Sequence, residues 1–500
     1  MPDTPPSPDD PTVAPDQATS AVPTSSSSPG GPARTEAPAV AQVEIAAQVA
    51  ALRAGFRSGR TRPLAARLAA LDALARGVRE HGDALREALR EDLGKHPVEA
   101  DVTEIGPVLA EIAHVRRNLR RWLVPRPVPL GALLAPGSGR LHRDPLGTVL
   151  VIAPWNYPVN LSLMPLIGAI AGGNTAILKP SEVAPASSAA LAALIGEHLD
   201  PAWVQVREGG VPETTALLAE RFDLVFYTGG GPVAKIVAHA AAEHLTPVVL
   251  ELGGKSPVFV DEGTDLAAAA RRIIWGKLTN AGQTCVAPDH LMATRATLDA
   301  LVPHLRDAIR AQHGADPRHS PAYGRIVNQR HTERLAALID PAHVVIGGQV
   351  DIPARYVAPT VLDGVRPADP CMGEEIFGPI LPLLEVSSAD EAIARIEAGD
   401  APLTAYVFSP DAQVQDRFVR GTRSGSLALD VTLAHLGARE MPFGGVGASG
   451  SGAYHGRASL EAFTHAKPVV RKPLSPDTLR LIQPPYSGAR ARLAQRLLRG

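Results

Sequence analysis

The hydrophobic pattern divides the chain into a helical block followed by two stretches in which short apolar runs alternate with helices. Apolar residues recur every three or four positions from Val43 to Trp122, which predicts four amphipathic helices. From Gly147 onward the expected strands are 148–152, 175–178, 203–206 and 224–227, and then 258–260, 290–293 and 381–386. Helices fit between them. This alternation is typical of βαβ units and predicts two α/β domains with parallel sheets.

Two segments do not follow that pattern. Residues 124–146 are rich in Pro and Gly and contain short alternating runs, which predict an exposed β-ribbon. Because an isolated ribbon is marginally stable, we expect another subunit to complete it. The first 40 residues contain Pro, Ser, Thr and Ala but almost no large apolar residue, so we expect a disordered tail there.

These patterns suggest a division of the chain into domains. The expected parts are a tail (1–40), a first α/β domain with its helical entry (41–123 and 147–253), a second α/β domain (254–440), a ribbon with its closing segment (124–146 and 441–475) and a basic C-terminal tail (476–500).

Composition excludes several classes of function. With 49 basic and 51 acidic residues the formal net charge is −2, which argues against a nucleic-acid partner. Two cysteines cannot form a disulfide framework, and no basic and apolar leader follows Met1, so we expect a reduced, cytoplasmic protein. The apolar stretch 161–171 is shorter than the roughly 20 residues that span a bilayer. For the C-terminal tail, a solvated helix is favoured over membrane association.

Cys285 is one candidate for chemistry. A lone cysteine is either a small buried hydrophobe or a nucleophile. Here Gly282, Gln283 and Thr284 precede it and Pro288 follows, a loop composition that buried core cysteines seldom have. The local sequence leaves both interpretations open.

Two polar residues lie at expected strand ends. Glu251 follows the apolar run 247–250, where burial would raise its pKa and make it a usable base, although an ordinary ion pair is also possible. Asn156 follows the strand 148–152 and could donate a hydrogen bond to a developing oxyanion. Taken singly, an Asn before Tyr157-Pro158 more often bonds its own backbone in a turn.

A phosphate site is also expected at this edge, because open parallel sheets bind ligands at the carboxyl ends of their strands. The turn 228–231 follows a strand and opens a helix near Val233, so its backbone amides would face an anion. Lys179, at another strand end, is either a ribose or phosphate contact or a surface lysine. The G-x-G-x-x-G match at 445–450 lacks a preceding strand and a following acidic residue, so we interpret it as a flexible loop.

Taken together, these residues resemble the aldehyde dehydrogenase superfamily, and in particular its class 3 branch. The resemblance spans about Val49 to Lys467. It rests on the motifs Pro154-Trp155-Asn156-Tyr157-Pro158, Leu178-Lys179-Pro180-Ser181-Glu182, Glu251-Leu252-Gly253-Gly254-Lys255, Gly282-Gln283-Thr284-Cys285 and Glu374-Glu375-Ile376-Phe377-Gly378-Pro379, with Asp92-Leu93-Gly94-Lys95 pointing to class 3.

The resemblance implies two Rossmann-like α/β domains, one for the cofactor and one for catalysis, with a small β oligomerisation ribbon and a homodimer. It implies NAD or NADP as cofactor, an aldehyde as substrate and no metal. Cys285 would be the nucleophile, Glu251 the base, and the Asn156 amide with the Cys285 N–H the oxyanion hole. The implied cofactor contacts are Trp155, Lys179, Glu182, Gly229, Gly230, Glu375 and Phe377.

The chain departs from the family pattern at two places. The usual Gly-Ser-Thr-x-Val-Gly turn is here Gly229-Gly230-Gly231-Pro232-Val233-Ala234, which leaves NAD or NADP preference open. His290 replaces a more usual aromatic, and we expect it to alter the pocket beside the nucleophile. The alternatives to an acid-forming dehydrogenase are a CoA-acylating enzyme, which a retained Glu251 disfavours, and a non-catalytic binding protein on the same fold.

Overall fold

The structure is a computed structural model that describes residues 39–486 and 488–498. The predicted tail therefore lies almost wholly outside the described residues. Within the described part, no helix is both long enough and apolar enough to cross a membrane.

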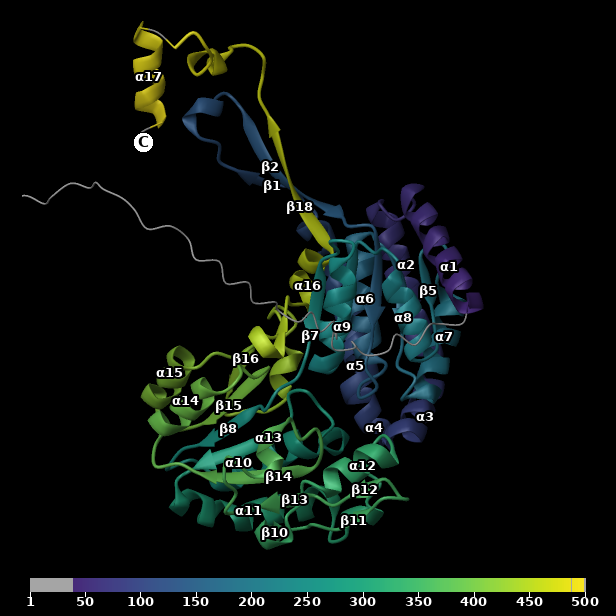
Figure 1. The fold of residues 1–500 in the computed structure, drawn as a ribbon, viewed down its shortest axis with the longest axis vertical. Coiled ribbons are helices and arrows are strands. Elements are labelled where there is room, and N and C mark those ends of the chain that lie inside the picture. Colours follow the sequence, from purple (N-terminus) through teal and green to yellow (C-terminus); the bar gives the residue numbers. More distant parts are fainter. Residues whose placement is uncertain (1–38, 487, 499–500) are drawn as a thin grey trace, which may run out of the picture. The chain divides into compact units, whose positions relative to one another are not determined.

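The predicted helical block is confirmed. It consists of α1 (Ala39–Arg57), α2 (Leu64–Glu80), α3 (Gly82–Leu93), α4 (Pro97–Ala100) and α5 (Gly106–Trp122) (Figure 1). The last of the four expected helices is interrupted, because Asp101–Ile105 forms one π-helical turn between α4 and α5. Such turns often occur at functional sites, and this one contains the buried Glu104.

The first sheet carries the strand-end residues that the sequence singled out. Its order is β17-β7-β6-β3-β4-β5, and the five strands from β7 to β5 run parallel. The bounds are β3 (Thr148–Ile152), β4 (Thr175–Lys179), β5 (Val204–Val206), β6 (Leu224–Thr228) and β7 (Val248–Glu251), with helices α6 (Asn160–Gly172), α7 (Pro185–His198), α8 (Val211–Ala219) and α9 (Gly231–Ala242). Since β3, β4 and β7 end near Asn156, at Lys179 and at Glu251, these residues share one edge.

The segment 445–450 differs from its prediction as a flexible loop. Gly447–Ser449 forms a short 3-10 helix, and β17 (Gly450–Ser451) pairs antiparallel with β7, placing Gly450 opposite Glu251. The glycines are explained by this close approach, because a side chain at Gly450 would clash with the Leu250 carbonyl. The segment therefore covers the strand that ends in Glu251.

The second sheet has the order β10-β13-β14-β9-β8-β15-β16. Its strands are β8 (Pro257–Val260), β9 (His290–Ala293), β10 (Val344–Ile346), β13 (Thr360–Leu362), β14 (Ile380–Glu385), β15 (Thr404–Phe408) and β16 (Ser426–Leu429). The helices of this part are α10 (Leu266–Leu278), α11 (Arg295–His313), α12 (Gln329–Ala336), α13 (Pro370–Gly373), α14 (Ala389–Ala398) and α15 (Ala412–Gly421), and β11 (Val350–Asp351) pairs with β12 (Tyr356–Val357). Each sheet has its own buried core, so the predicted α/β class is confirmed.

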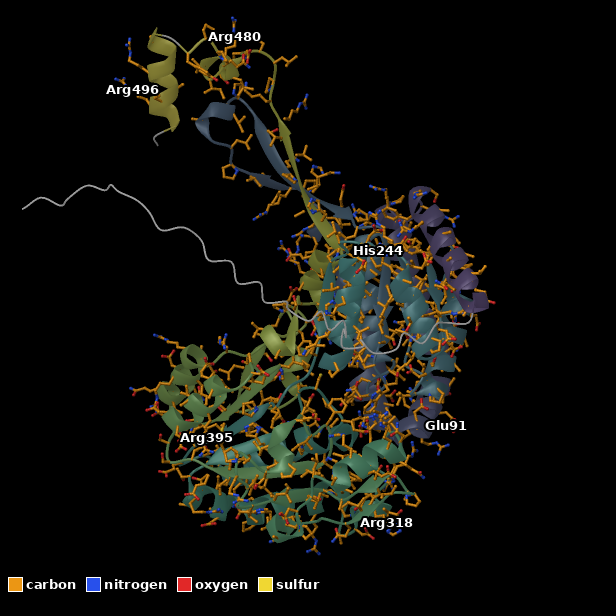
Figure 2. The ribbon with its side chains drawn as sticks, viewed as in Figure 1. Glu91, His244, Arg318, Arg395, Arg480 and Arg496 are labelled. Atoms are coloured by element: carbon orange, nitrogen blue, oxygen red, sulfur yellow. The ribbon has the colours of Figure 1, made fainter. Side chains whose placement is uncertain are left out.

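The ribbon is completed by the chain itself. Strands β1 (Arg126–Val128) and β2 (Ser138–Pro145) are joined by β18 (Thr464–Arg471), which follows α16 (Gly456–Ala462) and pairs with β2 along its whole length. Beyond β18, the C-terminal segment contains a 3-10 turn (Thr478–Leu481) and the helix α17 (Gly488–Leu498). Figure 2 shows the side chain of Arg480 on the turn and that of Arg496 on α17.

Candidate active site

Cys285 follows a turn of unusual backbone conformation. After α10, Asn280, Ala281 and Gly282 have φ of 54°, 51° and 77°, in the left-handed region that only glycine adopts freely. A side chain at position 282 would also clash with the Gly378 carbonyl, so glycine is required there. This turn ends the helix and directs the chain toward the cysteine.

Buried hydrogen bonds hold the residues that precede the cysteine. The Gln283 side chain donates to the carbonyls of Asn280 and Arg325, both at 3.0 Å, and accepts from the Val327 N–H at 2.9 Å. The Thr284 hydroxyl lies 2.6 Å from the hydroxyl of Tyr157. Because these bonds reach several separate elements, the cysteine loop is held in one conformation.

The Cys285 thiol lies in a cavity of about 480 Å³ with mainly apolar walls. Burial raises the pKa of this thiol, and the charges of Glu375 and Glu251 raise it further, whereas hydrogen bonds with the N–H groups of Cys285 and Val286 lower it. The resting cysteine is therefore a neutral thiol. It needs a base before it can act as a nucleophile.

Glu251 has the properties of such a base. Its side chain is 2% exposed at the end of β7, and neither carboxylate oxygen has a hydrogen-bond partner in the described part of the chain. Burial raises the pKa of Glu251 well above its ordinary value. Its charge acts on the pKa of both Cys285 and Tyr454, two groups of the cavity wall. The carboxyl is thus unpaired among the described residues and close enough to the thiol for its charge to raise the thiol pKa.

Asn156 lies against the cysteine loop rather than bonding its own turn. Its Nδ2 donates to the Gln283 carbonyl at 2.9 Å, and its own carbonyl accepts from the Asn280 amide at 2.8 Å. An amide NH₂ has two donors, so the second remains for a ligand. The structure therefore brings Asn156, Glu251 and Cys285 to one site.

A buried ion pair behind Asn156 was missed by the sequence analysis. The Lys95 ammonium lies 2.5 Å from the Glu104 carboxylate and also donates to the Asn156 carbonyl at 3.2 Å, and both side chains of the pair are fully buried. The other Glu104 oxygen accepts from the N–H groups of Val159 and Asn160, at 3.1 and 2.9 Å. The only signal in the sequence was the Asp92-Leu93-Gly94-Lys95 run.

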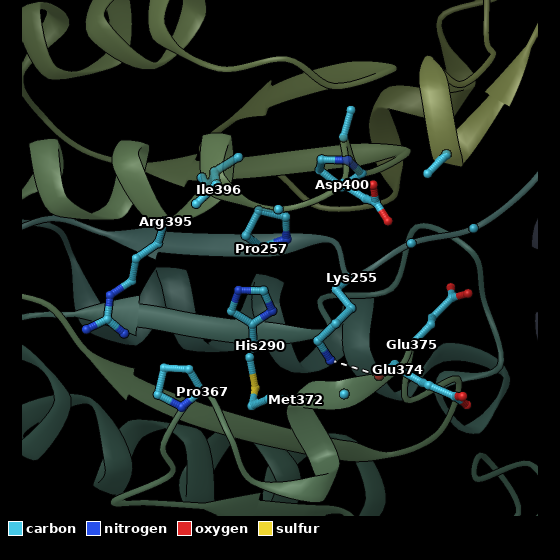
Figure 3. Close-up of a pocket in the computed structure, with 18 of the residues that line it drawn as sticks. Lys255, Pro257, His290, Pro367, Met372, Glu374, Glu375, Arg395, Ile396 and Asp400 are labelled. Atoms are coloured by element: carbon cyan, nitrogen blue, oxygen red, sulfur yellow. Dashed lines mark hydrogen bonds between the residues drawn. The ribbon is translucent and has the colours of Figure 1, made fainter. Parts of the chain in front are cut away.

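A second cavity, of about 720 Å³, extends from the end of β7 and the start of α9 across the second sheet (Figure 3). Glu375 lies in its wall against Gly253, where any side chain would clash with the carboxylate. Burial, reinforced by the charge of Asp289, raises the pKa of Glu375 to about 8. A carboxyl whose pKa lies close to neutral pH can be protonated or ionised, so it can donate a hydrogen bond to a bound sugar hydroxyl or accept one from it.

The loop that carries Glu375 is fixed by Lys255. The Lys255 ammonium donates to the Glu374 carbonyl at 2.9 Å (Figure 3). It also donates to the Cys371 carbonyl at 3.0 Å and lies 2.5 Å from the Asp289 carboxylate. The other Asp289 oxygen accepts from the Ile376 N–H at 2.9 Å. These contacts place Glu375 before any ligand arrives.

His290 differs from its expected position. It begins β9 and lines the larger cavity that contains Glu375, whereas it is absent from the wall of the Cys285 cavity. Burial lowers the pKa of His290, against the opposing effect of Asp289. A histidine in place of the more usual aromatic residue at position 290 therefore changes the wall of the larger cavity.

The residues present fit a dinucleotide. Helix α9 begins at Gly231 with no side-chain cap, and a side chain at Gly231 would meet open space, so the first-turn amides can face an anion. Lys179 is buried at the end of β4, 3.5 Å from Glu182, and desolvation lowers its pKa while Glu182 opposes the shift. The ring of Trp155 contacts that of Phe377 edge-on at 5.4 Å.

Comparisons with known proteins agree with this geometry. The model of the aldehyde dehydrogenase family matches residues 20–469. The chain is 44% identical over 443 residues to human aldehyde dehydrogenase family 3 member B1, covering 88% of this chain and 95% of that protein. It is 44% identical to a mouse protein named "aldehyde dehydrogenase, dimeric NADP-preferring", covering 88% and 97%. A substrate-bound Staphylococcus aureus AldH structure superposes with a TM-score of 0.89 at 42% identity, covering 91% of this chain and 99% of that one.

Proposed function

The chain belongs to the aldehyde dehydrogenase family and catalyses the NAD(P)-dependent oxidation of an aldehyde to a carboxylic acid, and we propose how its own residues carry out that reaction. Of the alternatives open from the sequence, these matches support aldehyde oxidation. The proposed roles rest on Glu251. Its carboxyl is buried, neither oxygen has a hydrogen-bond partner among the described residues, and its charge raises the pKa of Cys285.

In the first step Glu251 accepts the proton of Cys285, directly or through one water, because the thiol is neutral at rest. The thiolate then adds to the aldehyde carbon and forms a thiohemiacetal. The Asn156 amide and the Cys285 backbone N–H donate to its oxyanion, and one such donor typically contributes about 10²-fold or more in rate.

NAD or NADP, when bound, supplies the acceptor for the hydride that leaves the thiohemiacetal. The product of that loss is a thioester on Cys285. Glu251 first releases the proton taken from Cys285 to solvent and then, as a carboxylate again, removes a proton from a water molecule that attacks the thioester carbon. The C–S bond breaks, the carboxylic acid leaves, and the cysteine thiolate regains a proton from Glu251. A single carboxyl thus serves both proton transfers.

The proposed cofactor contacts follow the edge of the first sheet. Lys179 and Glu182 hold the adenosine ribose, Gly229 and Gly230 at the start of α9 hold the pyrophosphate, and Glu375 holds the nicotinamide ribose. Trp155 and Phe377 pack beside that end. The first sheet with its helical entry is accordingly proposed as the cofactor domain and the second as the catalytic domain.

The cavity around Cys285 favours an apolar aldehyde. Its walls include Met164, Leu433, Phe443 and the buried ring of Tyr454. A long aliphatic or aromatic group would bury apolar surface there, at about 25 cal/mol per Å². Glu111, whose pKa burial raises to about 7, is one of the few charged groups in the wall.

The experiment that tests this function measures reduced cofactor and product over an aldehyde panel, with NAD or NADP and with or without CoA. We expect a free acid, unchanged by CoA, because Glu251 is present to activate water. Acyl-CoA as the product would support the acylating alternative. Absence of turnover with every aldehyde would support the binding protein.

We also propose that the protein acts as a homodimer in a reducing, cytoplasmic setting. The three-stranded ribbon of β1, β2 and β18 offers an assembly surface, and a relative carries "dimeric" in its name. Both cysteines are free thiols. Analytical ultracentrifugation tests the assembly, and a monomer at working concentration would contradict it.

A further inference from the structure

Two Glu-His dipeptides that are far apart in the sequence meet at the ends of two helices. Glu80 is the last residue of α2 and His81 follows it, while Glu197 and His198 lie at the end of α7. The helices pack against each other, so the dipeptides pair reciprocally. His81 Nε2 lies 3.1 Å from a Glu197 oxygen, and His198 Nε2 lies 3.5 Å from a Glu80 oxygen.

The ligand atoms converge on one point. Those of His81, Glu197 and His198 all lie within 4.8 Å of one another. His198 Nε2 also lies 4.0 Å from the second Glu197 oxygen. In a tetrahedral zinc site with bonds of about 2.0–2.1 Å, neighbouring ligand atoms are about 3.3 Å apart. The observed separations bracket that value, and the two glutamates are more than half exposed and free to adjust.

The burial of the His198 side chain distinguishes this cluster from two ordinary surface ion pairs. Only 10% of it is exposed, and its Nε2 is buried without a hydrogen-bond partner among the described residues. The Glu80 oxygen 3.5 Å away is its nearest carboxylate, but the pair does not form a hydrogen bond, and a buried polar atom without one is costly, which leaves room for a ligand. Gly77 of α2 makes room for the ring, because a Cβ there would lie 2.8 Å from His198 Cδ2. The two imidazoles are in T-shaped contact, with their ring centroids 5.4 Å apart.

We propose that His81, His198 and Glu197 form a structural site for a divalent transition-metal ion, with zinc as the natural fit, and that the exposed Glu80 side chain, 3.5 Å from His198 Nε2, moves in to complete the coordination. Two neutral imidazoles with carboxylates suit zinc, whereas calcium and magnesium prefer all-oxygen sites. None of the four residues lines the two cavities described above. The ion therefore joins the ends of α2 and α7 and stabilises the fold without taking part in aldehyde oxidation, and the inference is independent of the proposed catalytic roles.

The test uses the full-length protein stripped of metal with a chelator. Zinc is titrated by competition with a chromophoric chelator, and unfolding is followed with and without zinc. We expect one zinc ion per chain and a higher melting temperature, because an ion that binds only the folded state stabilises it. Substituted cobalt should give visible absorption typical of tetrahedral nitrogen and oxygen ligands, without the charge-transfer band of a thiolate.

The variants His81→Ala and His198→Ala should each weaken zinc binding by at least about 10-fold and remove the melting shift. The matched control is His319→Ala, which removes an exposed histidine 2.7 Å from a single carboxylate and should leave zinc binding unchanged. Melting without zinc shows whether each variant folds, and His198→Gln serves if the alanine variant does not. Absence of zinc binding by the wild-type protein, wild-type affinity in either histidine variant, or a thiolate band would overturn the proposal.

Discussion

The Lys95 ammonium donates a hydrogen bond to the backbone carbonyl of Asn156 across 3.2 Å. The same group is paired with the buried Glu104, whose other oxygen accepts from the next turn of chain, at Val159 and Asn160. Lys95 is therefore a positioning residue. It fixes the backbone of the residue that donates to the oxyanion, although it does not itself reach the substrate cavity.

Replacing Lys95 by Met should lower both stability and kcat. Leaving Glu104 buried without its partner should cost about 3–5 kcal/mol, and a displaced Asn156 should lower kcat on the order of 10²-fold. The double variant Lys95→Met/Glu104→Gln should recover much of the stability but not kcat, with KM for the cofactor unchanged. Denaturant melts and steady-state rates measure both. Recovery of kcat in the double variant would show that Lys95 acts through stability alone.

The rate should depend on pH through Glu251. Burial raises the pKa of this carboxyl, so its basic form, and with it the rate, increases as pH rises through the raised pKa. Glu251→Gln should lower kcat by about 10²–10⁴-fold and remove that limb of the profile. The variant is nearly isosteric, so cofactor binding serves as the control. A variant that keeps the wild-type profile would assign the base to another group.

Glu375 should make folding stability fall as pH rises. Its pKa in the folded state is about 8, above the ordinary 4.5, so between these values the folded chain binds more protons than the unfolded chain. Stability from this group is thus complete below about pH 4.5 and is lost as pH rises through 8. In the Glu375→Gln variant, the unfolding free energy should differ less between pH 5 and pH 8 than it does in the wild type. Parallel curves for variant and wild type would contradict the buried, protonated carboxyl.

Gly282 should tolerate no side chain. Its φ of 77° and the nearby Gly378 carbonyl predict that Gly282→Ala displaces the cysteine loop, which should lower kcat by about 10²-fold even if the protein folds. Gly196→Ala is the matched control, because a Cβ meets open space in the helix α7 and should add about 0.5–1 kcal/mol of stability. Rates and melts of both variants check this. Equal kcat and equal stability of the two variants would refute the steric argument.

The elements that the sequence predicted well are those with a strong local pattern. The strands β3 and β9 have the expected bounds, since buried apolar runs are visible within a few residues. The edge shared by Asn156, Lys179 and Glu251 followed from the same reasoning, because parallel strands end on one side of a sheet.

What the sequence could not reveal depends on contacts between distant segments. β17 pairs with the strand of Glu251 across about 200 residues, so a glycine-rich run there was interpreted as a flexible loop. Lys95 lies 61 positions from Asn156, and the Asp92-Leu93-Gly94-Lys95 run, the only local signal, does not indicate which residues it contacts. His290 was placed by its sequence position near Cys285, but the strand β9 carries it into the other cavity.

The most direct test of the account compares the two cysteines of the chain. Initial rates of reduced-cofactor formation are measured for Cys285→Ala and Cys371→Ala, after a fluorescence titration shows that each variant still binds NAD or NADP. Cys371 is buried away from the aldehyde cavity, whereas Cys285 lies in it. We predict that Cys285→Ala loses at least about 10³-fold in kcat and that Cys371→Ala keeps wild-type activity. Substantial turnover by Cys285→Ala would contradict covalent catalysis at this residue.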